Sequence, residues 1–319
     1  MKKIFFAVTA VFLTFLKSYS QTNFDLRNKY PSTTNASYVT NLASLTKYEE
    51  KTILAAFDTI INSHIQFDYP QGGCQNRAHA MSLILSNKLK ISHSKIWLFS
   101  PSNLNQNDLL KLEIDDKNHL APNDVIKWNY HVAPCVLVSK GNKTDTLIID
   151  PSLNKTKPLR ISEWFAAMRN TKESKYTFLN PDWYFFLTDN SGKVITGEFY
   201  KFAIDNRWCA DNYRNLTLEK GLAINDLAIY INNKYLTTLR NSSIQADKDK
   251  FLSLRKVFGN VDVLTEFFGK LNSYCGVTVE DNLSLKQYWQ DHQALMSDAM
   301  AYYLTRLNHW TIKVQELEN

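Results

Sequence analysis

The feature that most constrains this chain is a glycine-rich turn that places one cysteine at the start of an apolar helix. The turn begins at Tyr69, passes through Gly72 and Gly73, and is followed directly by Cys74. Glycine adopts backbone angles that other residues avoid, and the apolar spacing from Met81 onward predicts a buried helix. A helix N-terminus favours a thiolate, which is the nucleophilic form of cysteine. An isolated cysteine is more often a small buried apolar residue, so a catalytic role needs further support.

Candidates for a base and its orienting group occur on one predicted hairpin. A cysteine nucleophile needs a general base, and the base needs a group that orients it. Residues 128–139 and 144–150 are predicted to be antiparallel strands, joined by turn residues 140–143. The first strand contains His131 and the second ends at Asp150.

The position of the turn decides which residues face each other on this hairpin. A two-residue loop at positions 140–141 would place His131 opposite Asp150, close enough for the carboxylate to hold an imidazole N–H. A loop at positions 141–142 would place Ser152 opposite His131 instead. Longer loops are also common, so the register stays open. Taken singly, His131 is typical of a core histidine and Asp150 of a turn residue.

Short motifs surround the three candidate residues. They are Tyr69-Pro70 followed by Gly73-Cys74, then Arg77-Ala78-His79, Tyr130-His131-Val132-Ala133 and Ile148-Ile149-Asp150-Pro151-Ser152-Leu153. The order cysteine, histidine, aspartate is that of papain-like and transglutaminase-like enzymes. Over about residues 45–170 the chain resembles the bacterial protein-glutaminases, also called protein-glutamine deamidases.

This resemblance implies a fold, a reaction and a set of roles. The expected fold is α+β, with a transglutaminase-like (papain-like) core of N-terminal helices packed on an antiparallel sheet. The implied reaction converts protein-bound glutamine to glutamate and releases ammonia. Cys74 would be the nucleophile, His131 the general base and acid, and Asp150 the orienting carboxylate. The expected partners are proteins or peptides that bear glutamine, and no cofactor is implied.

Two other classes of function stay open. One is a transglutaminase, cysteine peptidase or amidase on the same fold. The other is a non-catalytic envelope-binding module, in which the three residues serve packing or Cys74 forms a disulfide with Cys135. If Cys74 is a working thiol, the favoured bridge among the four cysteines is Cys209 to Cys275. No Cys-x-x-Cys or His-x-x-x-His spacing occurs, so a metal site is not expected.

The N-terminus has the pattern of a signal peptide at residues 1–20. Lys2 and Lys3 precede an apolar run from Ile4 to Leu16, and small residues precede a predicted cleavage point before Gln21. The apolar run is 13 residues long, whereas a membrane span needs about 20. We therefore expect a secreted or periplasmic protein without stable membrane insertion after cleavage. An uncleaved anchor is the alternative.

Composition favours a folded protein and argues against nucleic acid as a partner. The chain is 44% apolar and 13% aromatic, which is too hydrophobic for a disordered protein. Its formal charge of +6 falls to +3 when the three lysines of the predicted signal peptide are removed. Such a mild charge is not the basic footprint of a nucleic-acid-binding protein.

The chain is predicted to contain a catalytic domain and a helical part. Residues 21–195 would form the catalytic domain and residues 196–319 a helical C-terminal domain or extension. Capping boxes at residues 46–49 and 284–287 predict the start of the first and the last helix. The polar stretch 101–123 is predicted to be a long loop.

Overall fold

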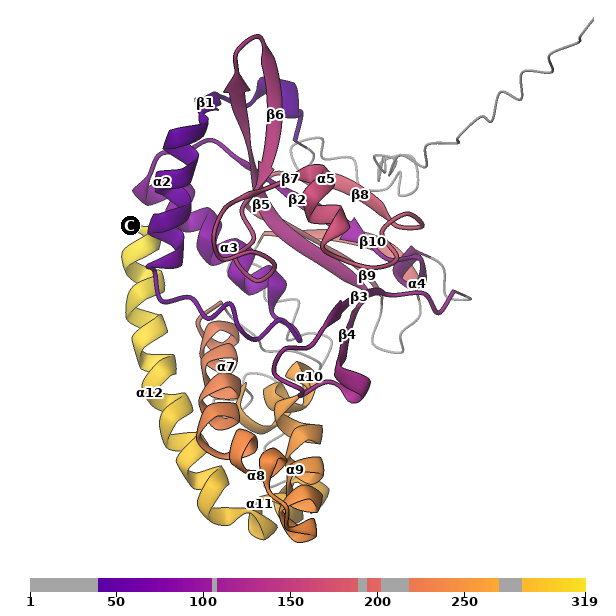
Figure 1. Cartoon of the computed structure of the whole chain (residues 1–319). Coiled ribbons are helices and arrows are strands. Elements are labelled where there is room, and N and C mark those ends of the chain that lie inside the picture. The colour runs from indigo at the N-terminus through magenta and orange to yellow at the C-terminus, as the bar shows by residue number, and fades with distance from the viewer. Residues whose placement is uncertain (1–39, 105–107, 189–193, 202–217, 270–282) are drawn as a thin grey trace, which may run out of the picture.

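The computed structural model describes residues 40–104, 108–188, 194–201, 218–269 and 283–319. It shows an antiparallel sheet with helices on both faces and a helical C-terminal region (Figure 1). This architecture confirms the predicted α+β composition. The predicted signal peptide and the proposed Cys209–Cys275 bridge lie outside the described residues.

The main sheet is organised around one long strand, β5 (Tyr130–Lys140). Its strand order is β7-β6-β5-β2-β8, with all neighbours antiparallel, and β1 pairs in parallel with the end of β5. The other strands are β1 (Lys47–Glu49), β2 (Ser94–Phe99), β6 (Lys143–Ile148), β7 (Leu159–Arg160) and β8 (Lys175–Leu179). As the central strand, β5 can present side chains to both layers of helices.

Two smaller hairpins flank this sheet. One consists of β3 (Leu112–Asp115) and β4 (Val125–Trp128), and the other of β9 (Trp183–Thr188) and β10 (Val194–Lys201). The predicted loop at residues 101–123 therefore contains a short helix, α4 (Pro101–Leu104), and strand β3.

Alternating side chains of β5 belong to two hydrophobic cores. Val132 and Val136 pack in the core that includes α2 (Glu50–Ile61) and α3 (Cys74–Leu83). Ala133 and Cys135 pack in the second core, with α5 (Ile161–Ala166). This alternation follows from the two-residue period of a strand.

The C-terminal helices share the first of these cores. Their bounds are α7 (Leu218–Ile231), η5 (Asn232–Leu236), α8 (Thr237–Asn241), α9 (Gln245–Phe258), α10 (Val261–Leu264), η6 (Thr265–Gly269), α11 (Leu283–Asp291) and α12 (Gln293–Glu318). In Figure 1, α12 runs back along the molecule so that the C-terminus lies near α2. Buried residues of α7 and α12, such as Leu222 and Met296, belong to the same core as Ile53 of α2. The division near residue 195 remains a prediction.

The predicted start of the first helix at residue 46 is wrong. Residues Lys47–Glu49 instead form β1, which pairs with Leu137, Val138 and Ser139 of β5, and α2 begins at Glu50. Pairing satisfies the backbone groups of both segments, and this tertiary gain outweighs the local capping signal. The predicted last helix is divided at His292, between α11 and α12. Within the described residues, no helix has both the length and the apolar character needed to cross a membrane.

Candidate active site

The predicted turn and helix place Cys74 at the first position of α3. Gly73 precedes it with φ 70° and ψ 18°, a left-handed conformation that favours glycine. Gly73, the residue at the cap position, has no side chain to cap this helix end, and the first backbone bond of the helix runs from the Arg77 N–H to the Gly73 carbonyl. Cys74 is buried with 7% of its surface exposed. Both Cys74 and Cys135 are free thiols, so the alternative disulfide between them is absent.

His131 and Asp150 form a buried ion pair. The Nε2 atom of His131 lies 2.7 Å from Oδ2 of Asp150, and the side chains are 1% and 3% exposed. His131 faces Leu98 of β2 across the sheet. Because Nε2 is occupied by Asp150, the second ring nitrogen is Nδ1, which has no hydrogen-bond partner among the described residues. Cys74 is close enough to raise the pKa of this imidazole, while its thiol donates to Oε1 of Gln75 at 3.6 Å. The three predicted residues are thus together in space.

The pairing register differs from the one that the shorter loop would give. Lys140 pairs with Lys143, so the loop is at positions 141–142, and continuing this register would place Ser152 opposite His131. Asp150 still reaches the imidazole because β6 ends at Ile148 and the chain then turns. In this turn the backbone N–H groups of Leu153 and Asn154 donate to the Asp150 carbonyl. The pair therefore forms through a turn at the strand end.

Two tryptophans hold the pair in place, and neither was predicted from the sequence. The imidazole of His131 stacks on the Trp128 ring, with a centroid distance of 4.4 Å, and on the Trp164 ring at 5.6 Å. The Trp164 Nε1–H donates to Oδ2 of Asp150 at 2.8 Å. The Trp128 Nε1–H donates to the carbonyl of Pro70 at 2.8 Å, which ties the turn before Cys74 to the histidine. No local pattern marks these roles, because both depend on tertiary packing.

The electrostatics of the pair favour a charged imidazole. Burial lowers the pKa of His131, but Asp150 and Cys74 together raise it to about 9. Burial raises the pKa of Asp150, whereas His131, Trp164 and Arg77 lower it, and the net pKa lies below its usual value. At neutral pH His131 is therefore an imidazolium held beside the Asp150 carboxylate, and it can stabilise a thiolate at Cys74.

Arg77 lies in the first turn of α3, three residues after Cys74. Its Nη1 atom donates to the carbonyls of Tyr69 and Gly72, at 3.0 and 2.8 Å, and so fixes the glycine turn. Burial lowers its pKa, which the nearby Cys74 and Asp150 oppose. Arg77 thus has a structural role and also places positive charge near the thiol. His79 lies elsewhere, with Nδ1 3.3 Å from the buried Lys95 ammonium.

Substituting Gly73 is expected to affect activity more than substituting Gly141. Both glycines have positive φ, 70° and 60°, so alanine costs about 1–2 kcal/mol of stability at either position. A Cβ at Gly73 would also lie 3.0 Å from both amide atoms of Asn225, whereas at Gly141 no described atom is within 4 Å. Gly73→Ala should therefore lower both the free energy of unfolding and the rate of the amide hydrolysis expected from the sequence, and Gly141→Ala only the former. Equal losses of activity would contradict this expectation.

The stability contribution of the His131–Asp150 pair is expected to fall as the pH rises. The pKa of His131 is about 9 in the folded protein, against an ordinary value of 6.5. Between about pH 6.5 and 9 the folded state therefore binds a proton that the unfolded state has lost. The stabilisation by the charged pair is present in full below about pH 6.5 and is lost as the pH rises through about 9. Urea unfolding across this window should show a falling free energy of unfolding. In His131→Gln the decline should be flatter; an equally steep decline would assign the effect to another group.

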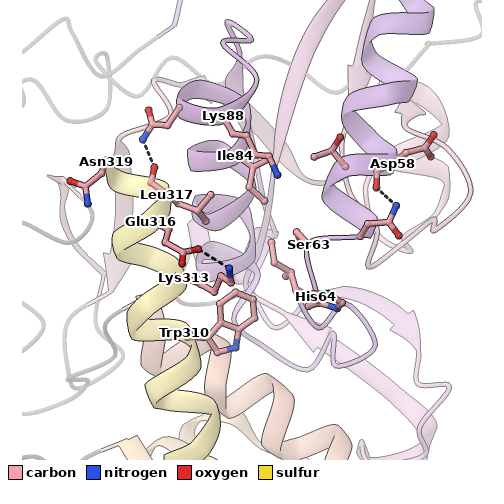
Figure 2. Close-up of a pocket in the computed structure, with 14 residues that line it drawn as sticks. Asp58, Ser63, His64, Ile84, Lys88, Trp310, Lys313, Glu316, Leu317 and Asn319 are labelled. Carbon is pink, nitrogen blue, oxygen red and sulfur yellow. Dashed lines mark hydrogen bonds and ion pairs between the residues drawn. The ribbon is translucent and has the colours of Figure 1, made fainter.

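The cavity in Figure 2 is separate from this site. It has a volume of about 750 Å³ and lies between α2, the π-helical turn η3 (Ile84–Lys88) and the end of α12, with His64, Trp310 and Lys313 among its lining residues. It contains none of Cys74, His131 and Asp150. Among the residues that the structure describes, no group of three or more His, Cys, Asp or Glu side chains is placed to hold a metal ion.

Comparison with known proteins gives one family match and two similar solved structures. Residues 19–168, which include all three candidate residues, match a family model described as glutaminase. The NMR structure of protein-glutaminase from Chryseobacterium proteolyticum is 21% identical, with a TM-score of 0.39, and the match covers 58% of this chain and 89% of that one. A crystal structure of protein-glutaminase is 21% identical, with a TM-score of 0.38, over 57% and 87% of the two chains. None of the curated proteins compared with the chain matches it.

Proposed function

Residues 19–168 of this chain belong to the glutaminase family, and from this premise we propose that the protein deamidates glutamine side chains of other proteins through Cys74, His131 and Asp150. The observation that carries the assignment of residues is the buried 2.7 Å contact between His131 and Asp150 next to the Cys74 thiol. In such an arrangement the carboxylate orients the imidazole and the imidazole activates the thiol.

The proposed reaction is acyl transfer through a thioester. The Cys74 thiolate attacks the carbon of the glutamine carboxamide, and His131 gives its proton to the departing nitrogen, so that ammonia leaves. His131 then takes a proton from water, which attacks the thioester and releases the acid. The acid gives its proton to ammonia, and the Cys74 thiolate and the His131 imidazolium are restored. The balance is one amide and one water consumed, and one carboxylate and one ammonium formed. The Cys74 backbone N–H, at the uncapped start of α3, would donate one hydrogen bond to the oxyanion.

We also propose a transglutaminase-like core and export from the cytoplasm. A helix that begins with the nucleophile and packs on a sheet that carries the histidine is the arrangement that supports the first proposal. Export rests on the signal-peptide pattern of residues 1–20.

A surface groove beside the pair is our proposed approach for the substrate protein. It has a volume of about 580 Å³ and is lined in part by Pro70, Pro151, Ser152 and Leu153. Pro70 belongs to the turn before the nucleophile, and Pro151 follows Asp150 directly. A polypeptide in this groove would therefore lie next to both segments that form the site.

The test is to incubate the purified protein with a blocked glutamine dipeptide and with a glutamine-containing protein. Ammonia release and product mass should show conversion of amides to acids, without peptide cleavage or crosslinking. The Cys74→Ala variant is the control and should release no ammonia above background. Crosslinked products would favour a transglutaminase and shortened products a peptidase. Absence of all three reactions in the wild type would overturn the enzymatic assignment.

A further inference from the structure

We propose that Asn225, on helix α7 of the C-terminal region, is a catalytic residue whose side-chain amide donates a hydrogen bond to the oxyanion formed at Cys74. This inference deepens the proposed function and rests on acyl transfer at Cys74. Residues 19–168, the segment matched by the glutaminase family, do not include Asn225. The assignment therefore comes from the position of this side chain in the fold.

The burial of Asn225 is the first observation. Its exposed fraction is 0%, yet neither Nδ2 nor Oδ1 has a hydrogen-bond partner among the described residues. A buried amide without partners destabilises a folded protein, because it loses its hydrogen bonds to water and gains none in return. Such groups are uncommon in native proteins, and a catalytic role is one of the explanations for them.

The position of this amide is the second observation. A Cβ built on Gly73 would lie 3.0 Å from both Nδ2 and Oδ1 of Asn225, so the amide lies against the residue that precedes the nucleophile. The same face of α7 packs on the first turn of α3, where Gly221 is in close contact with the Asn76 side chain. Helix α7 thus delivers an unpaired polar group directly to the nucleophile turn.

The chemistry of the reaction needs a donor at this place. Attack of the thiolate turns the carboxamide oxygen into an oxyanion, which is stabilised by preorganised N–H donors. The Cys74 N–H belongs to the first turn of α3, where N–H groups have no acceptor within the helix, so it can provide one donor. The Asn225 Nδ2 group would provide the second, while Oδ1 would accept an N–H of the substrate amide. Both unpaired atoms of Asn225 would then be satisfied only when substrate is bound.

The experiment compares Asn225→Ala with Asn232→Ala. Asn232 lies seven residues further along the same helical run, so it has a similar direction, and it is also buried with an unpaired Oδ1. Loss of one oxyanion donor typically lowers kcat by about 10²- to 10³-fold. We expect this loss in ammonia release for Asn225→Ala and an unchanged rate for Asn232→Ala.

Two additional reactions separate a catalytic from a structural role. Acylation of Cys74 by p-nitrophenyl acetate also forms an oxyanion, so its burst of p-nitrophenol should slow in Asn225→Ala. Alkylation by iodoacetamide forms no oxyanion, so it should proceed at the wild-type rate. If alkylation of Asn225→Ala is slowed as much as its acylation, Asn225 only positions Cys74 and the proposal is overturned. Acylation at the wild-type rate in this variant would also overturn it.

A stability measurement gives an independent readout. Asn225→Leu removes the unpaired polar atoms and keeps the branching and the number of heavy atoms of the side chain, so we expect its Tm to rise by about 2–4 °C while ammonia release is lost. A lower Tm together with slower alkylation would indicate a packing role and contradict the proposal. If wild-type protein gives the acylation burst but no ammonia, the glutamine assignment fails and the burst still tests Asn225. If it gives neither, both proposals are overturned.

Discussion

The Cys74→Ala substitution is expected to lower kcat for ammonia release by roughly 10⁶-fold. Alanine has no atom that could form the proposed thioester, and the remaining His131–Asp150 pair would have no nucleophile to activate. The fold should persist, because Cys74 is one small residue at the edge of a large core. The measurement is ammonia release at saturating glutamine dipeptide, with circular dichroism to verify folding.

Cys135 provides the matched control for this substitution. It is also a buried free thiol, but burial raises its pKa to about 12, so it remains protonated and unreactive at neutral pH. Cys135→Ala should therefore retain wild-type kcat at a modest cost in stability. Residues that act as a unit are not additive, so the double variant Cys74→Ala, His131→Ala should be no slower than Cys74→Ala alone. Activity that survives in Cys74→Ala but is lost in Cys135→Ala would reverse the assignment of the nucleophile.

The parts of this site that the sequence predicted are those with local signals. Gly73 and Cys74 are adjacent, and a left-handed residue before a helix is a property of a few consecutive positions. The contact between His131 and Asp150 was also predicted, although for a different reason. The strand register that would have placed them opposite each other is not the one observed, and the contact forms in the turn after β6. A one-residue change of loop position could not be decided from the loop sequence alone.

The parts that sequence reasoning missed depend on contacts between distant segments. Trp128 and Trp164 look like ordinary core aromatics in the sequence, and only the fold shows that their rings stack on His131. Asn225 lies 151 positions after Cys74 in the printed sequence, and nothing near it resembles a catalytic motif. The wrong prediction of a helix start at residue 46 has the same cause. Residues 47–49 form a strand because they pair with β5, and the local sequence contains no signal for that pairing.

The Asp150→Asn substitution is expected to lower kcat by about 10⁴-fold, although it changes few atoms. The carboxylate accepts hydrogen bonds from His131 and, at 2.8 Å, from Trp164, and it is the main reason that the pKa of His131 is raised. A neutral amide cannot stabilise an imidazolium, and it can present an N–H to Nε2 and so select the wrong tautomer. Burial would then lower the pKa of His131, because the opposing charge is gone.

Two measurements separate this effect from simple unfolding. In the pH profile of residual activity, the alkaline limb of Asp150→Asn should lie at lower pH than that of the wild type, because His131 loses its proton earlier. The control is Asp145→Asn, a carboxylate on β6 that is bonded to Arg160 at 2.6 Å, outside the site. This pair is half-buried, and no hydrogen bond among the described residues joins it to Cys74, His131 or Asp150, so the variant should keep wild-type kcat and pH dependence. If Asp150→Asn keeps the alkaline limb near pH 9, the raised pKa of His131 does not come from Asp150, and the base of the reaction must be sought elsewhere.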